Sequence, residues 1–309
     1  MKKNSNIKGI LILLFCAFIW GSCFVAQAEG MEKVEPFTFG AARMLIGSFV
    51  LIPVMAFSRV RAGKKPDFNP AEHKAKIKRS LIAGAGIGVV LTAASSTQQY
   101  SLVDSAPGKV AFITAFYMFL VPIFGLFLKK RPGPAVWLSL IPGIFGLYLL
   151  CIGPGGLGSV GKGDYLAFAC AVLYAVHILC IERFGADADP VALSFMQFLV
   201  TGVLCFVLML IFEKPDFSLV LSCAVPILYA GVLSSGVAFT LQTVGQRYAE
   251  PAVASLAMCT ESVFGVLSSC VFYRTLPTLR EGFGCAVMFL AIILSQTPDL
   301  IAFFKKKEI

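Results

Sequence analysis

Residues 9–27 read GILILLFCAFIWGSCFVAQ and contain no charged side chain. A run of about 20 apolar residues can cross the hydrocarbon core of a bilayer as a helix, which satisfies its own backbone hydrogen bonds. Similar runs recur along the chain, since hydrophobic residues make up 58% of its 309 residues and charged residues only 14%. The charged share is about half that of soluble domains. This balance excludes an ordinary soluble enzyme, a disordered chain and a fibrous repeat, and it indicates a helical membrane protein.

Ten apolar segments, bounded by charge, proline and glycine, are predicted to be transmembrane helices. They are residues 9–27, 36–57, 80–100, 106–128, 134–152, 163–182, 190–212, 222–245, 251–273 and 279–297. The predicted fold class is therefore all-α integral membrane. The start of the chain imitates a signal peptide, with Lys2-Lys3, an apolar run and then Ala26-Gln27-Ala28. The run is longer than usual for such a peptide, which favours a retained span.

Basic residues predict the orientation, because short cytoplasmic loops of membrane proteins collect Lys and Arg. With the N-terminus inside, nineteen Lys and Arg residues fall in inner segments and five in outer loops. We therefore expect a multi-pass protein of the cell (inner) membrane with both termini in the cytoplasm. The ten cysteines lie in apolar stretches, where a thiol behaves as a small hydrophobic group. No disulfide framework, metal site or cofactor is expected.

The chain contains an internal duplication. Segment 14–43 aligns with segment 168–197 at a constant offset of 154, and a second match follows at an offset of 144. The aligned pairs include Trp20 with Tyr174, Arg43 with Gln197, and Gln98 with Gln242. The prediction is two five-helix repeats, residues 9–152 and 163–297, with the second inverted because each repeat has an odd number of spans. Inverted repeats are typical of secondary transporters, which bind substrate at the repeat interface.

Ordered motifs in both copies carry a resemblance to a known family. They are Phe18-Ile19-Trp20-Gly21-Ser22, Pro36 with Arg43, Gly108 to Thr114, Val121-Pro122, Leu241-Gln242-Thr243, Pro251 to Leu256, and Glu261-Ser262-Val263-Phe264. Over about residues 9–297 the chain resembles the drug/metabolite transporter (DMT) superfamily, specifically its EamA-type members. The resemblance implies ten helices in two repeats. It also implies export of a small polar metabolite, either an amino-acid-like solute or a drug-like compound.

Glu261 is the acidic residue that stands well inside a predicted span. Ten residues at about 1.5 Å each place it about 15 Å from Pro251, near the bilayer midplane. Charges at this depth are costly and are functional candidates by default. Glu261 is therefore a candidate for proton coupling or for contact with a cationic group of the substrate. The alternative is a structural hydrogen bond or ion pair with a facing helix.

Other polar and aromatic residues complete the predicted site. The candidate substrate-binding residues are Trp20, Gln98, Lys109, Tyr174, His177, Gln242 and Glu261. Lys109 either attracts a carboxylate or phosphate of the substrate or extends its side chain to water. The aromatic residues either line a substrate site or pack between helices, and a lone histidine is commonly a satisfied hydrogen-bonding residue. Structural and helix-packing roles are predicted for Arg43, Gly84, Gly88 and Pro122. For Arg43 the same two alternatives as for Lys109 stand beside this role, extension of the side chain to water or attraction of a substrate carboxylate or phosphate.

The first functional hypothesis is a secondary transporter that works by alternating access. A passive channel or facilitator is the alternative. An integral membrane enzyme acting on a lipid-linked substrate is a weaker one, because such enzymes group histidines with carboxylates and here His73 and His177 stand apart. No catalytic residue is predicted. The expected partners are a small-molecule substrate, the lipid bilayer and protons, without nucleic acid, and the protein is expected to be a monomer or a homodimer.

Overall fold

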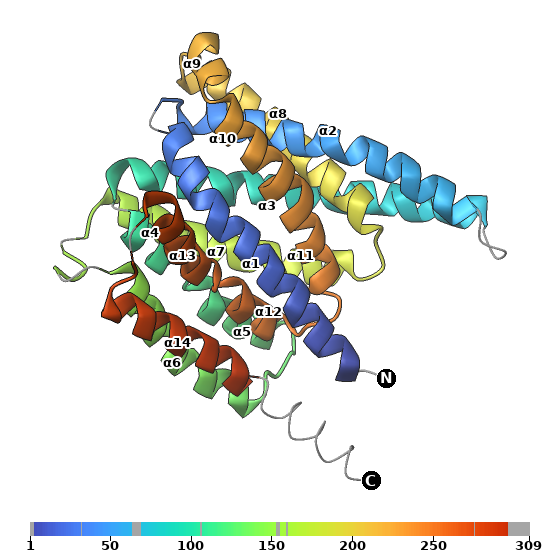
Figure 1. The fold of residues 1–309 in the computed structure, drawn as a ribbon. Helices are drawn as coiled ribbons and strands as arrows, with labels where there is room; N and C mark the ends of the chain where they lie inside the picture. Colours follow the sequence, from blue (N-terminus) through green and yellow to red (C-terminus); the bar gives the residue numbers. More distant parts are fainter. Residues whose placement is uncertain are drawn as a thin grey trace, which may run out of the picture.

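The computed structural model describes residues 3–31, 33–63, 69–105, 107–152, 155–158, 160–274 and 276–295. Within these ranges the secondary structure is helical and contains no strand (Figure 1). The helices are α1 (Lys3–Met31), α2 (Pro36–Gly63), α3 (Pro70–Asp104), α4 (Pro107–Thr114), α5 (Tyr117–Phe127), α6 (Pro134–Cys151), α7 (Lys162–Gly185), α8 (Pro190–Phe212), α9 (Phe217–Ser222), α10 (Ala224–Tyr229), η1 (Ala230–Phe239), α11 (Thr240–Gly245), α12 (Pro251–Met258), α13 (Glu261–Tyr273) and α14 (Leu279–Ser295).

Eight segments of the described chain are long and apolar enough to cross a membrane. They are Pro36–Arg61, Pro70–Asp104, Lys109–Phe127, Pro134–Cys151, Lys162–Gly185, Pro190–Phe212, Ala224–Gly245 and Pro251–Tyr273. α1 carries a shorter apolar stretch, Ile7–Cys23, and α14, with 17 residues, stands where the tenth span is predicted. Large apolar side chains such as Phe127 and Leu210 are exposed on the surface. The predicted class, an all-α integral membrane protein, is confirmed.

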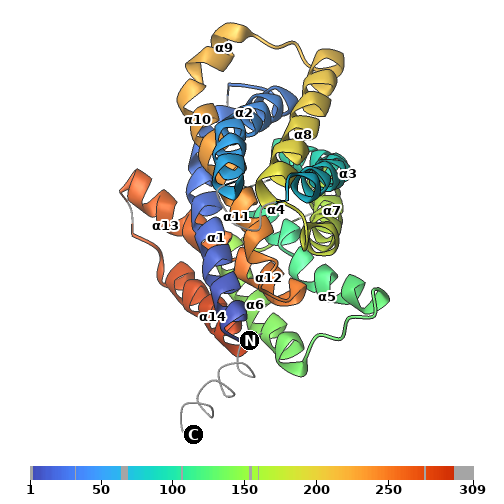
Figure 2. The ribbon, with the colours of Figure 1, turned by 90° about the vertical axis from the view of Figure 1, so that its right-hand side faces the viewer.

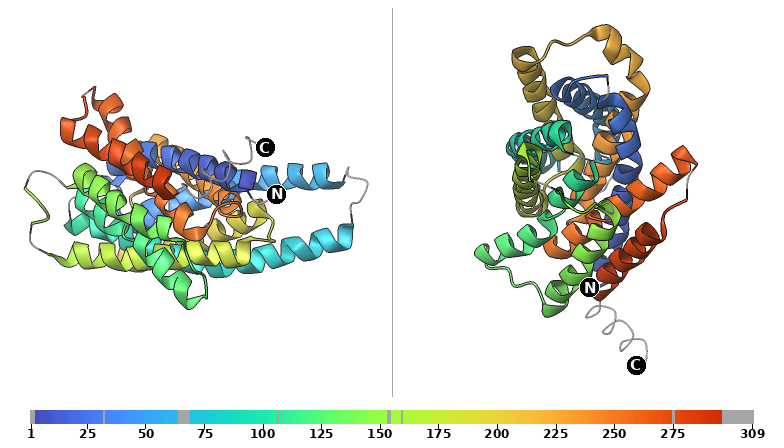
Figure 3. Two further views of the ribbon diagram at one scale, coloured as in Figure 1. Left: turned by 90° about the horizontal axis from the view of Figure 1, so that it is seen from below. Right: turned by 90° about the vertical axis from the view of Figure 1, so that its left-hand side faces the viewer.

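Several helices are longer than the spans predicted for them, and α2 and α3 are examples. The sequence predicts spans at 36–57 and 80–100, whereas α2 continues to Gly63 and α3 begins at Pro70. The added turns are rich in Ala, Lys and Arg, which are good helix formers although they are not all apolar. Asn69 also caps α3, because its side chain accepts hydrogen bonds from two amides of the first turn. The extended ends project together beyond the rest of the bundle (Figure 3).

Two predicted spans, 106–128 and 251–273, are each broken into two helices. The breaks lie between α4 and α5 and between α12 and α13. At each break, backbone N–H groups bond carbonyl oxygens three residues back instead of four, which tightens the chain locally. The two breaks touch, since Cys259 Sγ donates a hydrogen bond to the Ala115 carbonyl oxygen over 3.6 Å. They are also equivalent positions, because 115 and 259 differ by the same offset of 144.

The predicted span 222–245 is not a regular α-helix either. Its centre is the π-helix η1, with α10 before it and α11 after it. Small residues let η1 and α2 cross closely, since a Cβ added to Gly47 would lie 2.6 Å from the Ser235 Cβ. One added to Gly231 would lie 3.0 Å from the Arg43 carbonyl oxygen. This crossing fixes the backbone of Arg43 against η1.

Contacts between helices follow the same pattern when the two halves of the chain are exchanged. α2 packs on α8, α5 on α12 and α6 on α14, and each pair joins equivalent spans. α3 packs on α7, and in the same way η1 and α11, which correspond to α3, pack on α1, which corresponds to α7. Figure 2 shows α6 and α14 side by side at one end of the bundle. The limits predicted for the two repeats, 9–152 and 163–297, stay a prediction.

Candidate functional site

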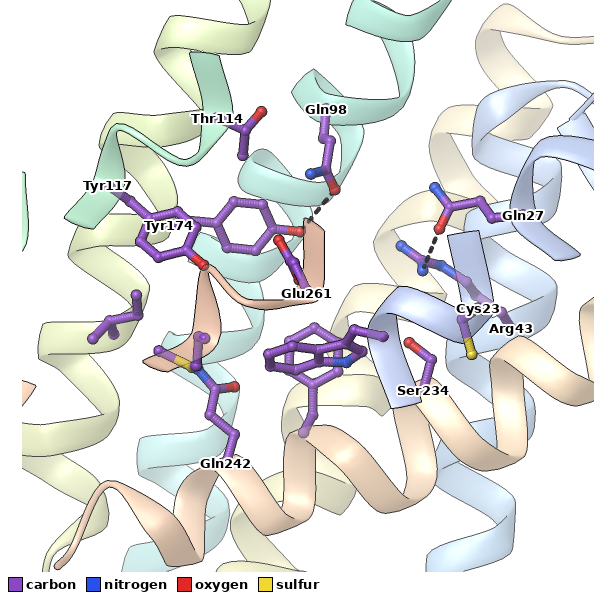
Figure 4. Close-up of a pocket in the computed structure, with 14 residues that line it drawn as sticks. Cys23, Gln27, Arg43, Gln98, Thr114, Tyr117, Tyr174, Ser234, Gln242 and Glu261 are labelled. Atoms are coloured by element: carbon purple, nitrogen blue, oxygen red, sulfur yellow. Dashed lines mark hydrogen bonds between the residues drawn. The ribbon is translucent and has the colours of Figure 1, made fainter. Parts of the chain in front are cut away.

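A central cavity lies among the helices of both halves, with about 670 Å³ of empty space when the part open to the surroundings is included. Its lining combines aromatic, amide and charged side chains: Trp20, Cys23, Gln27, Arg43, Gln98, Thr114, Tyr117, Tyr174, Ile178, Ser234, Phe239, Gln242, Met258 and Glu261. Figure 4 shows the labelled members converging on one space from several helices.

The cavity brings together five of the seven predicted substrate-binding residues. Trp20, Gln98, Tyr174, Gln242 and Glu261 all line it. Tyr174 Oη donates a hydrogen bond to Gln98 Oε1 over 3.2 Å, and Trp20 packs edge-on against Phe239 with ring centroids 4.9 Å apart. The residue pairs that the sequence aligns between the predicted repeats, Trp20 with Tyr174 and Gln98 with Gln242, therefore line one cavity.

Glu261 is the first residue of α13, directly after the break in its span. The break turns the chain so that the Glu261 carboxylate lies near Tyr174 and Gln98 (Figure 4). Among the described residues, no cationic side chain lies within 4 Å of it, the distance that defines the ion pairs of the structure. α1 packs directly against the start of α13, because a Cβ added to Gly21 would lie only 2.6 Å from the Glu261 carbonyl oxygen.

Arg43, for which the sequence predicts a packing role or contact with a substrate anion, also lines the cavity. Its side chain is 5% exposed, and Nη1 donates to Gln27 Oε1 over 3.5 Å. With its amide oxygen turned toward the guanidinium, Gln99 accepts from Nη2 over 3.3 Å. Nε has no hydrogen-bond partner in the described structure. Arg43 is thus both packed and available to the cavity.

Lys109 is not brought to the cavity. Its Nζ lies 2.6 Å from Asp164 Oδ2, and Asp164 also accepts hydrogen bonds from Ser105 Oγ at 2.9 Å and from the Gly161 N–H at 2.8 Å. The pair joins α4 to the first turn of α7. The side chain therefore satisfies its charge within the protein rather than in water or on a solute.

His177 lies behind the cavity lining and is fully buried. Its Nε2 is 3.3 Å from Gln197 Oε1, and its ring contacts those of Tyr174 and Phe239. This placement supports the aromatic side chains of the cavity. It provides no direct contact with the cavity space.

The remaining predicted packing residues lie at helix contacts. A Cβ on Gly84 would lie 2.5 Å from the Leu193 carbonyl oxygen, and one on Gly88 would lie 2.7 Å from that of Gln197. Both glycines therefore allow α3 to approach α8 closely. Pro122 is buried within α5.

Sequence reasoning missed several lining residues, some of which the duplication could have indicated. Tyr117 stands at offset 144 from Glu261, and Cys23 stands at offset 154 from His177. Gln27, by contrast, is equivalent to the apolar Ile181, so the repeat gives no signal for it. Ser234 enters the lining through η1, whose geometry the apolar pattern does not reveal.

Comparison with known proteins identifies the family of this chain. A model of the EamA-like transporter family matches residues 7–152 and matches again over residues 161–297. The chain belongs to the EamA-like transporter family. This EamA-like protein is 24% identical over 305 residues to an uncharacterized transporter of Archaeoglobus fulgidus, with 95% of this chain and 89% of that protein covered. It is 22% identical to the uncharacterized transporter YwfM of Bacillus subtilis, with 96% of each chain covered.

Two further similarities agree with the family assignment. The uncharacterized transporter YoaV of Bacillus subtilis is 24% identical, with 76% of this chain and 78% of that protein covered. A solved crystal structure superposes with a TM-score of 0.77 at 20% identity, covering 96% of this chain and 99% of the other, and this similarity concerns the fold. The EamA-like chain is a multi-pass membrane transporter, and its family and relatives indicate a transporter rather than an enzyme.

Proposed function

We propose that this EamA-like protein is a secondary transporter that exports a small polar, amino-acid-like solute across the inner membrane by alternating access. The observation that carries the proposal is the central cavity, which equivalent residues of the two halves line together. In inverted-repeat transporters the substrate site lies at the repeat interface near the midplane. The proposed topology has both termini in the cytoplasm, and its basic residues include Lys64, Lys65 and Lys305 to Lys307, which lie outside the described residues.

The two broken spans supply a means of alternating access. Each break leaves two short helices that can tilt separately, and the contact between Cys259 and Ala115 joins the breaks to each other. Irregular backbone at membrane depth is tolerated where it is buried in protein or lines a cavity. Glu261 follows one break and Tyr117 follows the other, so tilting at either break changes the cavity lining.

Glu261 is proposed to couple transport to protons. A carboxylate facing a cavity without a nearby cation can exchange a proton with water on whichever side the cavity opens. Glu261→Gln keeps the shape of the side chain but removes this exchange. Glu29→Gln is a matched control, because Glu29 is an exposed acidic residue of α1 that does not line the cavity.

Efflux from proteoliposomes tests the proposal. Vesicles loaded with a panel of amino acids, organic acids, polyamines and nucleosides are compared with and without a pH gradient. We expect selective loss of one class, accelerated by the gradient in the native and Glu29→Gln proteins and insensitive to it in Glu261→Gln. Unchanged pH dependence in Glu261→Gln would exclude the coupling role. Flux that never runs against a concentration gradient would indicate a facilitator, and no flux from folded protein would argue against carriage of these solutes.

A further inference from the structure

Two buried hydrogen-bond donors of the cavity lining have no partner in the described structure. They are Arg43 Nε and Trp20 Nε1. A buried donor without an acceptor costs about 1–3 kcal/mol, and such groups are expected to find partners in one state of a working protein. Both side chains line the cavity, and these two nitrogens are covered by neighbouring atoms, so an acceptor reaches them only when the lining side chains shift. An anionic or carbonyl-bearing group supplies such an acceptor.

The surroundings of Arg43 hold its guanidinium without neutralising it. Gln27 and Gln99 accept from Nη1 and Nη2 at 3.5 and 3.3 Å, and the Phe39 ring lies 5.9 Å from the guanidinium carbon. None of these three groups carries a negative charge. The guanidinium is therefore oriented and desolvated while its full charge is retained, which is the condition under which it binds an anion strongly.

The second half of the chain has no arginine at the position that aligns with Arg43. Gln197 stands where Arg43 stands in the first repeat, and it bonds the buried His177. The acceptor side of the cavity lies elsewhere, with the Glu261 carboxylate and Gln242 Oε1, which also has no partner in the described structure. In Figure 4 Arg43 lies at one side of the cavity, Glu261 lies between Arg43 and Tyr174, and Gln242 lies apart from both. The cavity therefore offers one buried cation and, away from it, two side chains with acceptor oxygens.

We infer that Arg43 is a specificity-determining residue that binds the carboxylate of the transported solute. The planar fork of arginine matches the two oxygens of a carboxylate. A single buried cation opposed by Glu261 suits a monoanionic group better than a phosphate dianion. The solute then lies with its carboxylate at Arg43 and its remaining polar group toward Glu261 and Gln242. This inference rests on the proposed function and names the chemical group that the site selects.

Ligand binding to purified protein tests the inference independently of transport. Trp137→Phe leaves Trp20 as the only tryptophan, so quenching of its fluorescence reports on the cavity. The ligands are two matched trios: leucine, 4-methylpentanoate and 3-methylbutylamine, and lysine, 6-aminohexanoate and cadaverine. Each trio compares an amino acid, the acid without its α-amino group and the amine without its carboxylate. Inorganic phosphate is added as a control for binding of any anion. All variants are made in the Trp137→Phe background.

We expect the carboxylate-bearing members of at least one trio to bind at least about tenfold more tightly than its amine, a difference typical of a charge-assisted hydrogen bond. Arg43→Gln, which installs the residue found at the equivalent position 197, should remove this preference. Arg43→Lys should retain part of it, because it keeps the cation but loses the fork. Arg61→Gln is the matched control, since it removes an exposed arginine of the same helix.

Equal binding of acid and amine to the native protein would overturn the inference. So would retention of carboxylate affinity in Arg43→Gln, phosphate binding as tight as that of the carboxylates, or absence of quenching by every carboxylate. If Arg43→Gln does not fold, as judged by gel filtration and circular dichroism, an unchanged carboxylate preference in Arg43→Lys would overturn it. Efflux of panel solutes combined with any of these results would leave the proposed transport function standing while rejecting the role of Arg43.

Discussion

The ion pair between Lys109 and Asp164 stands where the other half of the protein has an apolar contact. By the two offsets, Lys109 corresponds to Val253 and Asp164 to Ile10, and both of the latter are buried in the core. The backbone contacts beside them match as well. A Cβ on Gly163 would lie 2.8 Å from the Ser101 carbonyl oxygen, and one on Gly9 would lie 2.9 Å from that of Gly245. The ion pair is therefore an addition to a contact that both halves share.

Removing one partner of this pair should destabilise the protein more than removing both. At 2.6 Å and an effective dielectric constant of 20, the gross attraction is about 6 kcal/mol. Desolvation offsets part of this value, because the side chains are only 15% and 5% exposed. Loss of one partner of a buried pair costs about 3–5 kcal/mol, whereas its replacement by neutral residues is often close to neutral. We therefore expect Lys109→Met and Asp164→Asn each to cost about 3 kcal/mol and the double variant to cost less than either single variant.

The coupling energy between Lys109 and Asp164 is measured on four proteins: the native protein, the two single variants and the double variant. Each is unfolded in mixed micelles by titration with sodium dodecyl sulfate and followed by circular dichroism. Asparagine at position 164 keeps the shape of the side chain and one acceptor oxygen, which can face the Gly161 N–H, while its amide nitrogen can donate to Ser105 Oγ in place of accepting from it. A single variant within about 0.5 kcal/mol of the native protein, the range of ordinary surface substitutions, would refute the reasoning. Strict additivity of the two substitutions would refute it equally.

Two further substitutions test the packing of α13 and the start of α2. Gly21→Val should displace α13, because the space at Gly21 is closed by backbone atoms 2.6 Å away. We expect a loss of stability of about 1–3 kcal/mol and loss of solute efflux, whereas Gly86→Val, which meets open space, should change neither. Glu213→Gln should cost about 1–3 kcal/mol, since the carboxylate accepts from the Phe37 and Thr38 amides at 2.6 and 2.7 Å and an amide nitrogen cannot accept. The same micelle titration measures both, and native stability in Glu213→Gln would contradict the assigned bonds.

The apolar pattern predicted the class of the fold and the approximate position of each span, because lipid tolerates only long apolar helices. It did not predict the breaks after Thr114 and Met258 or the π-helix η1. These features depend on how backbone groups pair inside the bundle, while the side chains remain apolar on both sides of each break. It also ended α2 too early and began α3 too late, since polar residues can extend a helix beyond the membrane.

The site was predicted best where residues of the two repeats could be aligned. Trp20 with Tyr174 and Gln98 with Gln242 were found in this way, and all four line the cavity. Lys109 was grouped with them because its charge lies in the first turn of the predicted span 106–128, but its partner Asp164 is 55 residues away. A contact over that separation is set by the packing of α4 on α7, which periodicity does not reveal.

The contact between the two breaks has a mechanical consequence. Because Cys259 Sγ donates a hydrogen bond to the Ala115 carbonyl oxygen, a tilt of α12 against α13 would strain the junction of α4 and α5. We therefore expect the two junctions to move together. In the proposed alternating-access cycle, such a coupling would make opening toward one side of the membrane depend on movement at the junction that faces the other half of the protein.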